Sequence, residues 1–575
     1  MEHFLRGGVF LAALTSIIDI ARAQGVPIPS SAEAAAIETR TRLLPPIRVD
    51  TLLIQNEAGR DCIFGPNLDD VTVTLRSIAL VGAEAFPDAA LTSESAGLPI
   101  GQPIAVNDIC TATRDLTSII RNAGYVFSRA YLPEQDITEG DLIFEFQAVR
   151  VSDVQIEGSD SGGVLEEIAA AIIAPGPYNA NETTVPAQLA LGDRLPTVLD
   201  PNGRLLRQSP ISTTALADAD TLEDTTTFIL SRNDIDTSPR FRFTLDNRGS
   251  EANGPWALDA SGTWYETFAP YDILGVRALQ ALDTEELTYL SVAYDYLLRA
   301  DGTALRFSLA GSTSEPGTDT LTAIDEENES LSASLSFYRP LIRTTEVSLA
   351  FTTRFDLRNS ESSQLGVPAT EDRLRVLRFG LEYGRRYETG SFLQAVGTLS
   401  QGIEGLGATE TGNPLATRSD GETAFTALEV YLRYTHRFES AVALTAQGIG
   451  QLSSDPLLSA EECGLGGERF GRAYNSSEIT GDHCMAASLE VARTFEDNLP
   501  TGMVALQPYG FLDAGRVFNF GTQADESLAS AGFGLRAEFG SGISASLEIA
   551  KPIGRETETS GNRDPRLLIG ISTSF

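Results

Sequence analysis

This 575-residue chain is rich in Asp and Glu side chains but poor in histidine and cysteine. The three histidines, His3, His436 and His483, are too few for a histidine-rich metal site or for histidine-based catalysis. A glycine-rich run at 464–471 lacks the Lys-Ser/Thr pair of a phosphate-binding loop and opens no predicted helix. No nucleophile, base and orienting group occur together in a recognisable motif. We therefore expect no enzymatic activity, no cofactor and no bound metal.

The four cysteines are the remaining candidates for covalent chemistry. They fall into two pairs that are local in sequence, Cys62 with Cys110 and Cys463 with Cys484. In an exported chain this arrangement predicts two disulfides, although four cysteines formally allow three pairings.

The N-terminus has the features of an export signal. Arg6 stands in a short polar lead, an apolar run covers 8–20, and Ala21-Arg22-Ala23 forms a small-x-small cleavage site. We therefore expect residues 1–23 to be a signal peptide. The apolar run is too short for a membrane-spanning helix, and no other segment approaches about 18 uninterrupted apolar residues.

The net charge of -37 limits the class of partner. Phosphate groups would repel such a chain, so the charge argues against nucleic acid and anionic lipid as partners. We interpret the acidity as solvated loops and periplasmic surface.

The last residues of the chain alternate in polarity as a β-strand does. Apolar or methyl-bearing side chains stand at every second position, at Leu567, Ile569, Ile571, Thr573 and Phe575. Such a strand fits the wall of a transmembrane β-barrel, with one face toward lipid and the other toward a polar lumen.

Similar alternating segments fill the chain beyond about residue 240. The segments 290–298 and 305–309 form one predicted hairpin, and 330–337 and 347–355 form another. About 335 residues at roughly 21 per strand and connection predict some 16 strands, an even number that closes a barrel. In lipid only helices and closed barrels satisfy every backbone hydrogen bond, so we expect an antiparallel transmembrane barrel over 236–575.

The region between the signal and the barrel predicts two small α+β modules. Residues 24–70 are polar and contain a short helical candidate, so we expect an N-terminal helix and linker there. The first module, 71–150, has strand patterns at 71–80, 125–130 and 141–146 and helical spacing at 108–123. The second, 151–235, begins and ends in strands, has a helical candidate near 164–173, and is irregular over 175–224.

One segment of the first module carries a family resemblance. Residues 124–140 read Gly-Tyr-Val-Phe-Ser-Arg-Ala-Tyr-Leu-Pro-Glu-Gln-Asp-Ile-Thr-Glu-Gly, which resembles the first POTRA module of the two-partner secretion transporters. These are the TpsB proteins, also called the ShlB/FhaC/HecB haemolysin secretion/activation family. The positions that carry this motif are Gly124, Tyr125, Arg129, Pro133 and Gln135. The resemblance implies that the second module is an atypical POTRA, because 186–222 resembles the family only loosely.

The resemblance continues through the barrel. It includes 245–250, 338–343 and 399–407, and its most specific part lies at 456–490. There Gly-Gly-Glu-Arg-Phe-Gly-Arg-Ala-Tyr at 466–474 is similar to the tip of the family's sixth extracellular loop, which folds back into the lumen. The resemblance therefore implies an inward-folding loop near 456–485. The terminal Phe575 also resembles the signal by which outer-membrane barrels are recognised for insertion.

The resemblance assigns roles to several residues of this loop. Arg472 stands at the arginine of the family's Arg-Gly-aromatic tip, between Phe470 and Tyr474, and Ala473 replaces the usual glycine. Asp513 occupies the position of the late-strand aspartate that pairs with this arginine in the superfamily. The implied lock is physically reasonable, because removing one partner of a buried ion pair costs about 3–5 kcal/mol. A disulfide between Cys463 and Cys484 would close the base of the loop.

The resemblance implies an outer-membrane transporter that secretes one large, β-helical, haemolysin-like or adhesin-like exoprotein by two-partner secretion without ATP. POTRA strand edges would capture the unfolded partner by strand addition. The other expected partners are outer-membrane lipid and, during biogenesis, the barrel assembly machinery and periplasmic chaperones. We expect a monomer with its POTRA modules in the periplasm.

Two other functions are compatible with parts of this plan. A barrel-assembly insertase shares the POTRA modules and the arginine tip but usually has more POTRA modules. A passive porin would need neither periplasmic modules nor the inward loop.

Overall fold

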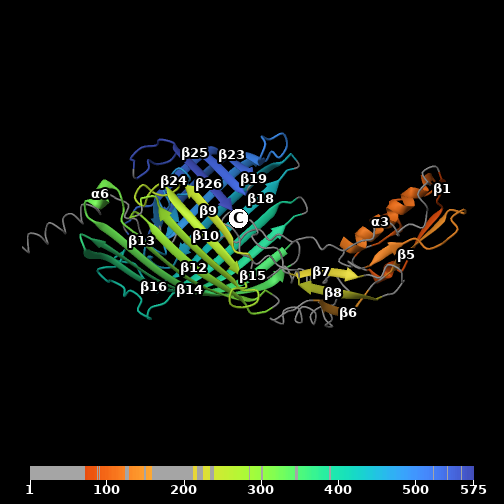
Figure 1. Cartoon of the computed structure of the whole chain (residues 1–575), viewed down its shortest axis with the longest axis horizontal. Coiled ribbons are helices and arrows are strands. Elements are labelled where there is room, and N and C mark those ends of the chain that lie inside the picture. The colour runs from red at the N-terminus through yellow and green to blue at the C-terminus, as the bar shows by residue number, and fades with distance from the viewer. Residues whose placement is uncertain are drawn as a thin grey trace, which may run out of the picture.

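The computed structural model describes residues 71–147, 150–157, 211–216, 225–232 and 238–575, with short gaps at 87–88, 90, 123–127, 284, 300–301, 344–346, 388–389, 439, 522, 541 and 559. The expected signal peptide, the N-terminal helix and linker, and most of the irregular part of the second module lie outside these residues. Cys62, Gly124 and Tyr125 also lie outside them. Figure 1 shows the barrel and the smaller sheets that precede it in the chain.

The first module packs a helix on a three-stranded sheet with the order β2-β5-β4. The helix α3 has one apolar face, on which Ile109, Leu116 and Ile120 are fully buried at helical spacing. Hydrogen bonds from Ser77 and Arg76 to Asp141 join β2 to β5 and hold the pKa of this carboxyl below its ordinary value. The elements are β1 (Thr72–Thr74), β2 (Ser77–Val81), η1 (Ala83–Ala85), η3 (Ser93–Ala96), β3 (Pro103–Ala105), α3 (Val106–Asn122), β4 (Arg129–Tyr131) and β5 (Asp141–Gln147).

The single strand expected over 71–80 is wrong, because the chain forms β1 and β2 there. β1 pairs with β3, whereas β2 pairs in parallel with β5. Between them Leu75 is fully buried, and the amides of Arg76 and Ser77 both donate to the carbonyl of Gly140, at 2.6 and 3.2 Å. The alternation in sequence continues through this change of partner, so periodicity alone could not reveal it.

The second module contains a three-stranded sheet with the order β6-β8-β7, formed by β6 (Arg150–Glu157), β7 (Ile211–Leu216) and β8 (Thr225–Arg232). β6 and β8 are parallel, and β7 is antiparallel to β8. The first module has the same combination, since β2 and β5 are parallel and β4 is antiparallel to β5. The helix expected near 164–173 lies outside the described residues.

A closed antiparallel barrel of sixteen strands confirms the predicted fold class. Each barrel strand pairs with the next barrel strand along the chain, β19 pairs directly with β22, and β9 pairs with β26 to close the ring. The strands are β9 (Arg240–Asp246), β10 (Ala257–Tyr265), β11 (Ile273–Ala281), β12 (Thr288–Leu297), β13 (Ala304–Ser314), β14 (Glu326–Arg343), β15 (Val347–Gln364), β16 (Val367–Arg386), β17 (Phe392–Gly402), β18 (Thr426–Arg437), β19 (Val442–Ser453), β22 (His483–Arg493), β23 (Met503–Phe518), β24 (Glu526–Phe539), β25 (Ile543–Pro552) and β26 (Arg566–Ser574).

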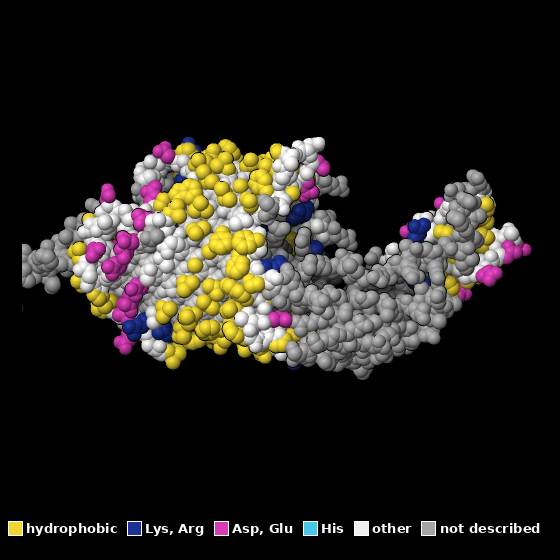
Figure 2. Space-filling model, in the orientation of Figure 1, with side chains coloured by type: hydrophobic (Ala, Val, Ile, Leu, Met, Phe, Trp, Pro, Cys, Tyr) yellow, Lys and Arg dark blue, Asp and Glu magenta, His cyan; other side chains and the backbone are white. Residues whose placement is uncertain are grey.

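The barrel wall has an apolar outer face. On β12, Leu290 and Tyr296 are exposed, whereas the intervening Asp295 is buried on the inner face. On β26, Leu567 and Ile571 are about half exposed, whereas Leu568 is only 3% exposed. Figure 2 shows the hydrophobic side chains as a band over the strands, with Asp and Glu side chains near the end that carries α6 (Asp319–Thr322). This pattern is that of an outer-membrane barrel.

The connections at the two ends of the barrel differ in length. Those at the end where the chain enters β9 are mostly tight, whereas several at the opposite end are long. The connections at this end that are used below are loop 5 (403–425), loop 6 (454–482), loop 7 (519–525) and loop 8 (553–565).

No helix among the described residues is both long enough and apolar enough to cross a membrane.

The seam between β9 and β26 is short but is fastened at both ends. Its register covers five residue pairs. At one end the backbones of Phe241 and Phe575 exchange hydrogen bonds of 2.9 and 3.1 Å, and their rings lie 6.0 Å apart. At the other end the Asn247 side chain donates to the carbonyl of Leu567 (2.8 Å) and accepts from the amide of Ile569 (2.6 Å). The side chain thus continues the strand ladder beyond Asp246.

Candidate functional site in the barrel lumen

Loop 6 folds against the inner face of the barrel wall. Its two short strands, β20 (Cys463–Leu465) and β21 (Ile479–Gly481), pair with each other. A disulfide joins Cys463 to Cys484 at the start of β22. Cys110 is also in a disulfide, and its expected partner Cys62 lies outside the described residues.

The tip of loop 6 is packed into an apolar cluster. Phe470, Ala473 and Tyr474 are each at most 4% exposed. The cluster also contains inward-facing side chains of β18 and of β22 to β26, among them Tyr431, Ala486, Phe511, Val517, Leu528, Ala550 and Leu568. Loop 6 therefore lies on this side of the lumen.

A glycine shapes the backbone immediately before Arg472. Gly471 has φ +100°, and a Cβ atom there would lie 2.7 Å from the Leu528 side chain. Both the backbone conformation and the space therefore require glycine. Ala473, which stands where the family has glycine, is not among the described residues with positive φ. Alanine is thus compatible with the tip of this chain.

The Arg472 side chain contacts several acidic and aromatic groups. Its Nη1 donates to Glu490 Oε2 at 2.8 Å and lies 3.6 Å from Glu548 Oε2, while its Nε lies 3.6 Å from Asp513 Oδ2. The guanidinium also stacks on the Phe511 ring, 4.0 Å from its centroid. Arg472 is 7% exposed, so its charge is balanced by buried carboxylates rather than by bulk water.

Asp513 holds the backbone of the tip. Its Oδ2 accepts hydrogen bonds from the amides of Gly471 (3.3 Å) and Arg472 (3.1 Å) and from the Ser530 hydroxyl (3.1 Å). The structure therefore brings Arg472 and Asp513 together, but the guanidinium donates its hydrogen bonds to Glu490 (2.8 Å) and to the Ser488 hydroxyl (3.4 Å).

Strand register places these groups at one level of the wall. Ser488 on β22 lies opposite Asp513 on β23, which lies opposite Ser530 on β24. Phe511 is two residues before Asp513, on the same face of β23, and lies opposite Gly532 on β24. A Cβ atom at Gly532 would be 2.6 Å from the Phe511 ring. Glycine thus makes room for the ring that supports Arg472.

Tyr474 anchors the other side of the tip. It is 1% exposed, and its hydroxyl lies within hydrogen-bond distance of the carbonyls of Ala529 (3.2 Å) and Arg555 (3.0 Å). These contacts attach loop 6 to β24 and loop 8.

Sequence reasoning missed Glu490, Glu548 and Phe511 as partners of Arg472. All three alternate with lipid-facing side chains on their strands, which marks them as inward-facing. This signal was present in the sequence. It could not single out these residues among the many polar inward positions.

The described residues of the POTRA motif have structural contacts. The Gln135 side chain donates to the carbonyl of Ile143 and accepts from its amide, both at 2.8 Å, and so extends the β5 edge beyond β4. Arg129 donates to the Gln147 side chain at 3.3 Å. Pro133 contributes a carbonyl that accepts from Gln135 at 3.3 Å.

Other candidate sites carry little chemistry. The described residues contain no group of three or more His, Cys, Asp or Glu side chains arranged to hold a metal ion.

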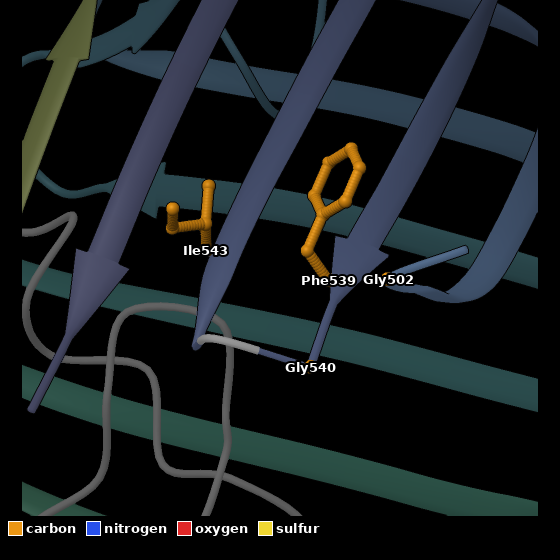
Figure 3. A pocket seen from close by; sticks show the side chains of 4 residues that line it. All are labelled: Gly502, Phe539, Gly540 and Ile543. Carbon is orange, nitrogen blue, oxygen red and sulfur yellow. The ribbon is translucent and has the colours of Figure 1, made fainter. Parts of the chain in front are cut away.

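An open pocket of about 400 Å³ is lined by Gly502, Phe539, Gly540 and Ile543, which Figure 3 shows. Its side chains are apolar and belong to the outer face, so it offers no groups for catalysis.

The family of the chain follows from its sequence. Residues 226–537, more than half of the chain, match the haemolysin secretion/activation protein family ShlB/FhaC/HecB. The chain belongs to this family. Residues 73–145 match the ShlB-type POTRA domain. No curated protein is similar enough in sequence to count as a relative.

Solved structures share the fold of this ShlB/FhaC/HecB protein. CdiB from Escherichia coli has a TM-score of 0.63 at 18% identity, covering 96% of this chain and 100% of CdiB. CdiB from Acinetobacter baumannii has a TM-score of 0.57 at 15% identity, covering 98% of both chains. BamA from Haemophilus ducreyi lacking POTRA domains 1–3 has a TM-score of 0.54 at 13% identity, covering 88% of this chain and 100% of BamA.

Family membership confirms three expectations. The protein is an outer-membrane barrel with a POTRA module in the periplasm, it is a transporter of two-partner secretion, and its partner is a secreted exoprotein. Because the chain enters the barrel from the periplasmic modules, loops 5 to 8 lie at the extracellular end.

Proposed function

We propose that this transporter exports one large exoprotein through the lumen of the closed barrel, and that the tip of loop 6 is the element that must move. The observation that carries the proposal is the buried contact of Arg472 with Glu490 and Asp513 inside the lumen. A plug held by polar contacts can be released and re-formed, because each lost hydrogen bond is replaced by one to water or to the passing chain.

The proposed route needs no nucleotide. Residues 464–471 form part of β20 and the tip, and they open no helix that could bind phosphate. The POTRA modules would hold the unfolded exoprotein by strand addition at exposed sheet edges. Folding of the exoprotein outside the cell, in a β-helical form, would make its passage irreversible. We propose no catalytic activity for the chain.

Further parts of the proposal concern biogenesis and assembly. Residues 1–23 would direct export, and Phe575 would mark the barrel for the assembly machinery after transport by periplasmic chaperones. The transporter would act as a monomer in the outer-membrane lipid. We also propose that 71–150 and 151–235 are the two POTRA modules, that 236–575 is the barrel domain, and that the POTRA motif residues belong to the first module.

Secretion assays test the role of the tip. The exoprotein encoded beside this gene should appear in the medium only when the chain is present, and Arg472→Ala should reduce secretion. The reason is that truncation leaves the buried Asp513 without its cation and leaves Glu490 with Arg536 alone, and losing one partner of a buried pair costs about 3–5 kcal/mol. The matched control is Arg306→Ala, which removes an inward arginine paired with Asp295 at 2.7 Å on strands away from loop 6.

Two results would count against the proposal. Full secretion by Arg472→Ala would remove the tip from the mechanism. Exoprotein that stays in the periplasm in every strain, with loss of other barrels when the chain is absent, would support an insertase.

A disulfide across the seam between β9 and β26 tests the route of the exoprotein. It distinguishes passage through the lumen from sideways release between these two strands. Thr244 on β9 and Ser572 on β26 lie opposite each other. The double variant Thr244→Cys/Ser572→Cys should form a disulfide across the seam and leave secretion unchanged, since a lumenal route does not require β9 and β26 to part. Each single cysteine variant is the control. Secretion that stops on oxidation and returns on reduction would contradict the lumenal route.

A further inference from the structure

Three extracellular loops meet at one buried carboxylate. Asp482 ends loop 6 and is 0% exposed. Its two oxygens accept from Arg418 Nη1 at 2.9 and 2.8 Å, and Arg418 belongs to loop 5 and is 5% exposed. This buried ion pair joins loop 5 to loop 6.

Loop 7 is attached to the same pair. The Phe520 amide donates to Asp482 Oδ2 at 2.8 Å, and the Phe520 carbonyl accepts from Arg418 Nη2 at 3.2 Å. The amide of Leu457, at the start of loop 6, donates to Asp482 Oδ1 at 2.7 Å. Each oxygen of Asp482 therefore has one bond from the guanidinium and one from a backbone amide. A carboxylate with this set of donors is well satisfied only when all three loops are in place.

Apolar packing supports the ion pair. Leu457 and Leu458 of loop 6 are fully buried in one cluster with Ala416 and Phe425 of loop 5. The side chain of Glu462 adds a second carboxylate, 3.3 Å from Arg418 Nη1, and accepts from the Thr480 hydroxyl at 2.8 Å. Separating loops 5 and 6 would expose this cluster and leave buried charges without partners.

The ion pair lies at the opposite end of loop 6 from the tip contact. The hairpin of β20 and β21 separates Asp482 from the tip, and the Cys463–Cys484 disulfide closes the base of the hairpin. These elements fix the base of the loop, whereas the tip is attached to the wall by its own side chains and by wall side chains that bond to its backbone, such as Asp513. The two attachments of loop 6 are therefore separate in structure.

We propose that Arg418 and Asp482 form an outer clamp, which keeps the extracellular mouth closed by fastening loops 5, 6 and 7 together. The clamp acts independently of the contact between Arg472 and the barrel wall. The inference rests on one part of the proposed function, namely that the barrel lumen is the channel for export. Asp482 and Arg418 are positioning residues of this channel, because they hold loops and need not touch the exoprotein.

Passive leak through the full-length transporter tests the clamp. The single-channel conductance of the purified chain in planar bilayers, and vancomycin influx into cells, should both rise several-fold in Arg418→Ala and in Asp482→Asn. The amide of Asp482→Asn would turn its NH₂ group toward a backbone N–H donor or toward the guanidinium, so it cannot reproduce the four bonds. Arg418→Lys keeps the charge but has no planar fork, so we expect a smaller rise.

The controls separate the clamp from general damage. Arg516→Ala removes an exposed ion pair with Asp525 at loop 7 and should leave both readouts at the wild-type level. Heat-modifiable mobility on gels reports whether each barrel is folded. The double variant Arg418→Ala/Asp482→Asn should leak no more than the worse single variant, since both changes remove one clamp.

The outcomes decide the proposal. Wild-type leak in any folded variant of Arg418→Ala or Asp482→Asn would overturn it, and so would additive leak in the double variant. If Arg418→Ala does not fold, wild-type leak in folded Arg418→Lys and Asp482→Asn would overturn it equally. Because leak is measured without an exoprotein, a failure of secretion in the wild type would contradict the proposed function and leave the clamp standing.

Discussion

At the scale of single residues, the lumenal arginine is held by a shared set of carboxylates. Glu490 bonds to Arg472 and also to Arg536, whose Nη1 lies 2.7 Å from Glu490 Oε1. Asp513 instead accepts from backbone amides of the tip. Glu490 thus acts on the tip through the Arg472 side chain alone, whereas Asp513 holds the backbone and also lies 3.6 Å from the Arg472 Nε.

Glu490→Gln should loosen the tip while the barrel stays folded. The amide keeps one acceptor but loses the charge shared by two arginines, and hydrogen bonds to charged groups contribute about 1.5–3 kcal/mol. Arg469 and Arg472 are the only basic residues of loop 6, so trypsin cleavage within 454–482 reports on the tip. Cleavage should be faster in the variant than in wild type.

The disulfide supplies a built-in check on this measurement. A cut at Arg469 or Arg472 lies between Cys463 and Cys484, so the fragments should separate only on a reducing gel. The control is Glu496→Gln, an exposed glutamate in the connection between β22 and β23. Equal cleavage rates in all three proteins would show that Glu490 does not hold the tip.

At the scale of elements, amide side chains complete two strand ladders. Gln135 bonds to both backbone groups of Ile143 at the edge of β5. Asn247 bonds to Leu567 and Ile569 at the end of the barrel seam. An amide carries a donor and an acceptor, so it can replace one peptide unit where the partner strand has ended. In both places the motif residues resemble those of the family, and the structure gives them a physical role.

Asn247→Ala should weaken the seam. The change removes two hydrogen bonds of about 1 kcal/mol each from a strand pair that has only five register positions. The temperature at which the heat-modifiable folded form is lost should therefore fall, and secretion at low temperature should persist. Asn562→Ala, at an exposed loop asparagine, is the control and should not change this temperature. An unchanged transition in Asn247→Ala would mean that the ladder alone holds the seam.

At the scale of the whole molecule, 79 acidic side chains outnumber 42 basic ones, so acidic groups are left without a basic partner and the net charge is -37. Pairs such as Arg378 with Glu461 and Arg418 with Asp482 are largely buried and are therefore weakly screened by salt. The excess acidic groups repel one another, and those that face solvent are screened.

Added salt should therefore stabilise the folded transporter. Raising NaCl from about 0.01 M to 0.1 M shortens the screening length from about 30 to 10 Å, which reduces repulsion between surface carboxylates. We expect the unfolding temperature in a non-ionic detergent to rise by a few degrees. Sucrose at the same osmolality is the uncharged control. A fall in the unfolding temperature would show that ion pairs, rather than repulsion, dominate the salt response.

The sequence by itself determined the barrel and the position of the tip. Alternation with period two is a local property, so the lipid-facing positions of β12 and β26 could be read without knowing any partner strand. Chain length set the number of strands, and the motif at 466–474 marked the loop that folds inward.

Only the tertiary structure decided which charges meet. Arg472 and Glu490 are brought together by an inward loop and by strand register. Arg418 and Asp482, which are 64 positions apart in sequence, are brought together by two loops. The same holds for the division of 71–80 into β1 and β2, which depends on two different partner strands. Which side chains or strands contact each other depends on their distance in space, and many inward positions of the barrel carry similar polar residues. Their types alone therefore could not specify the contacts.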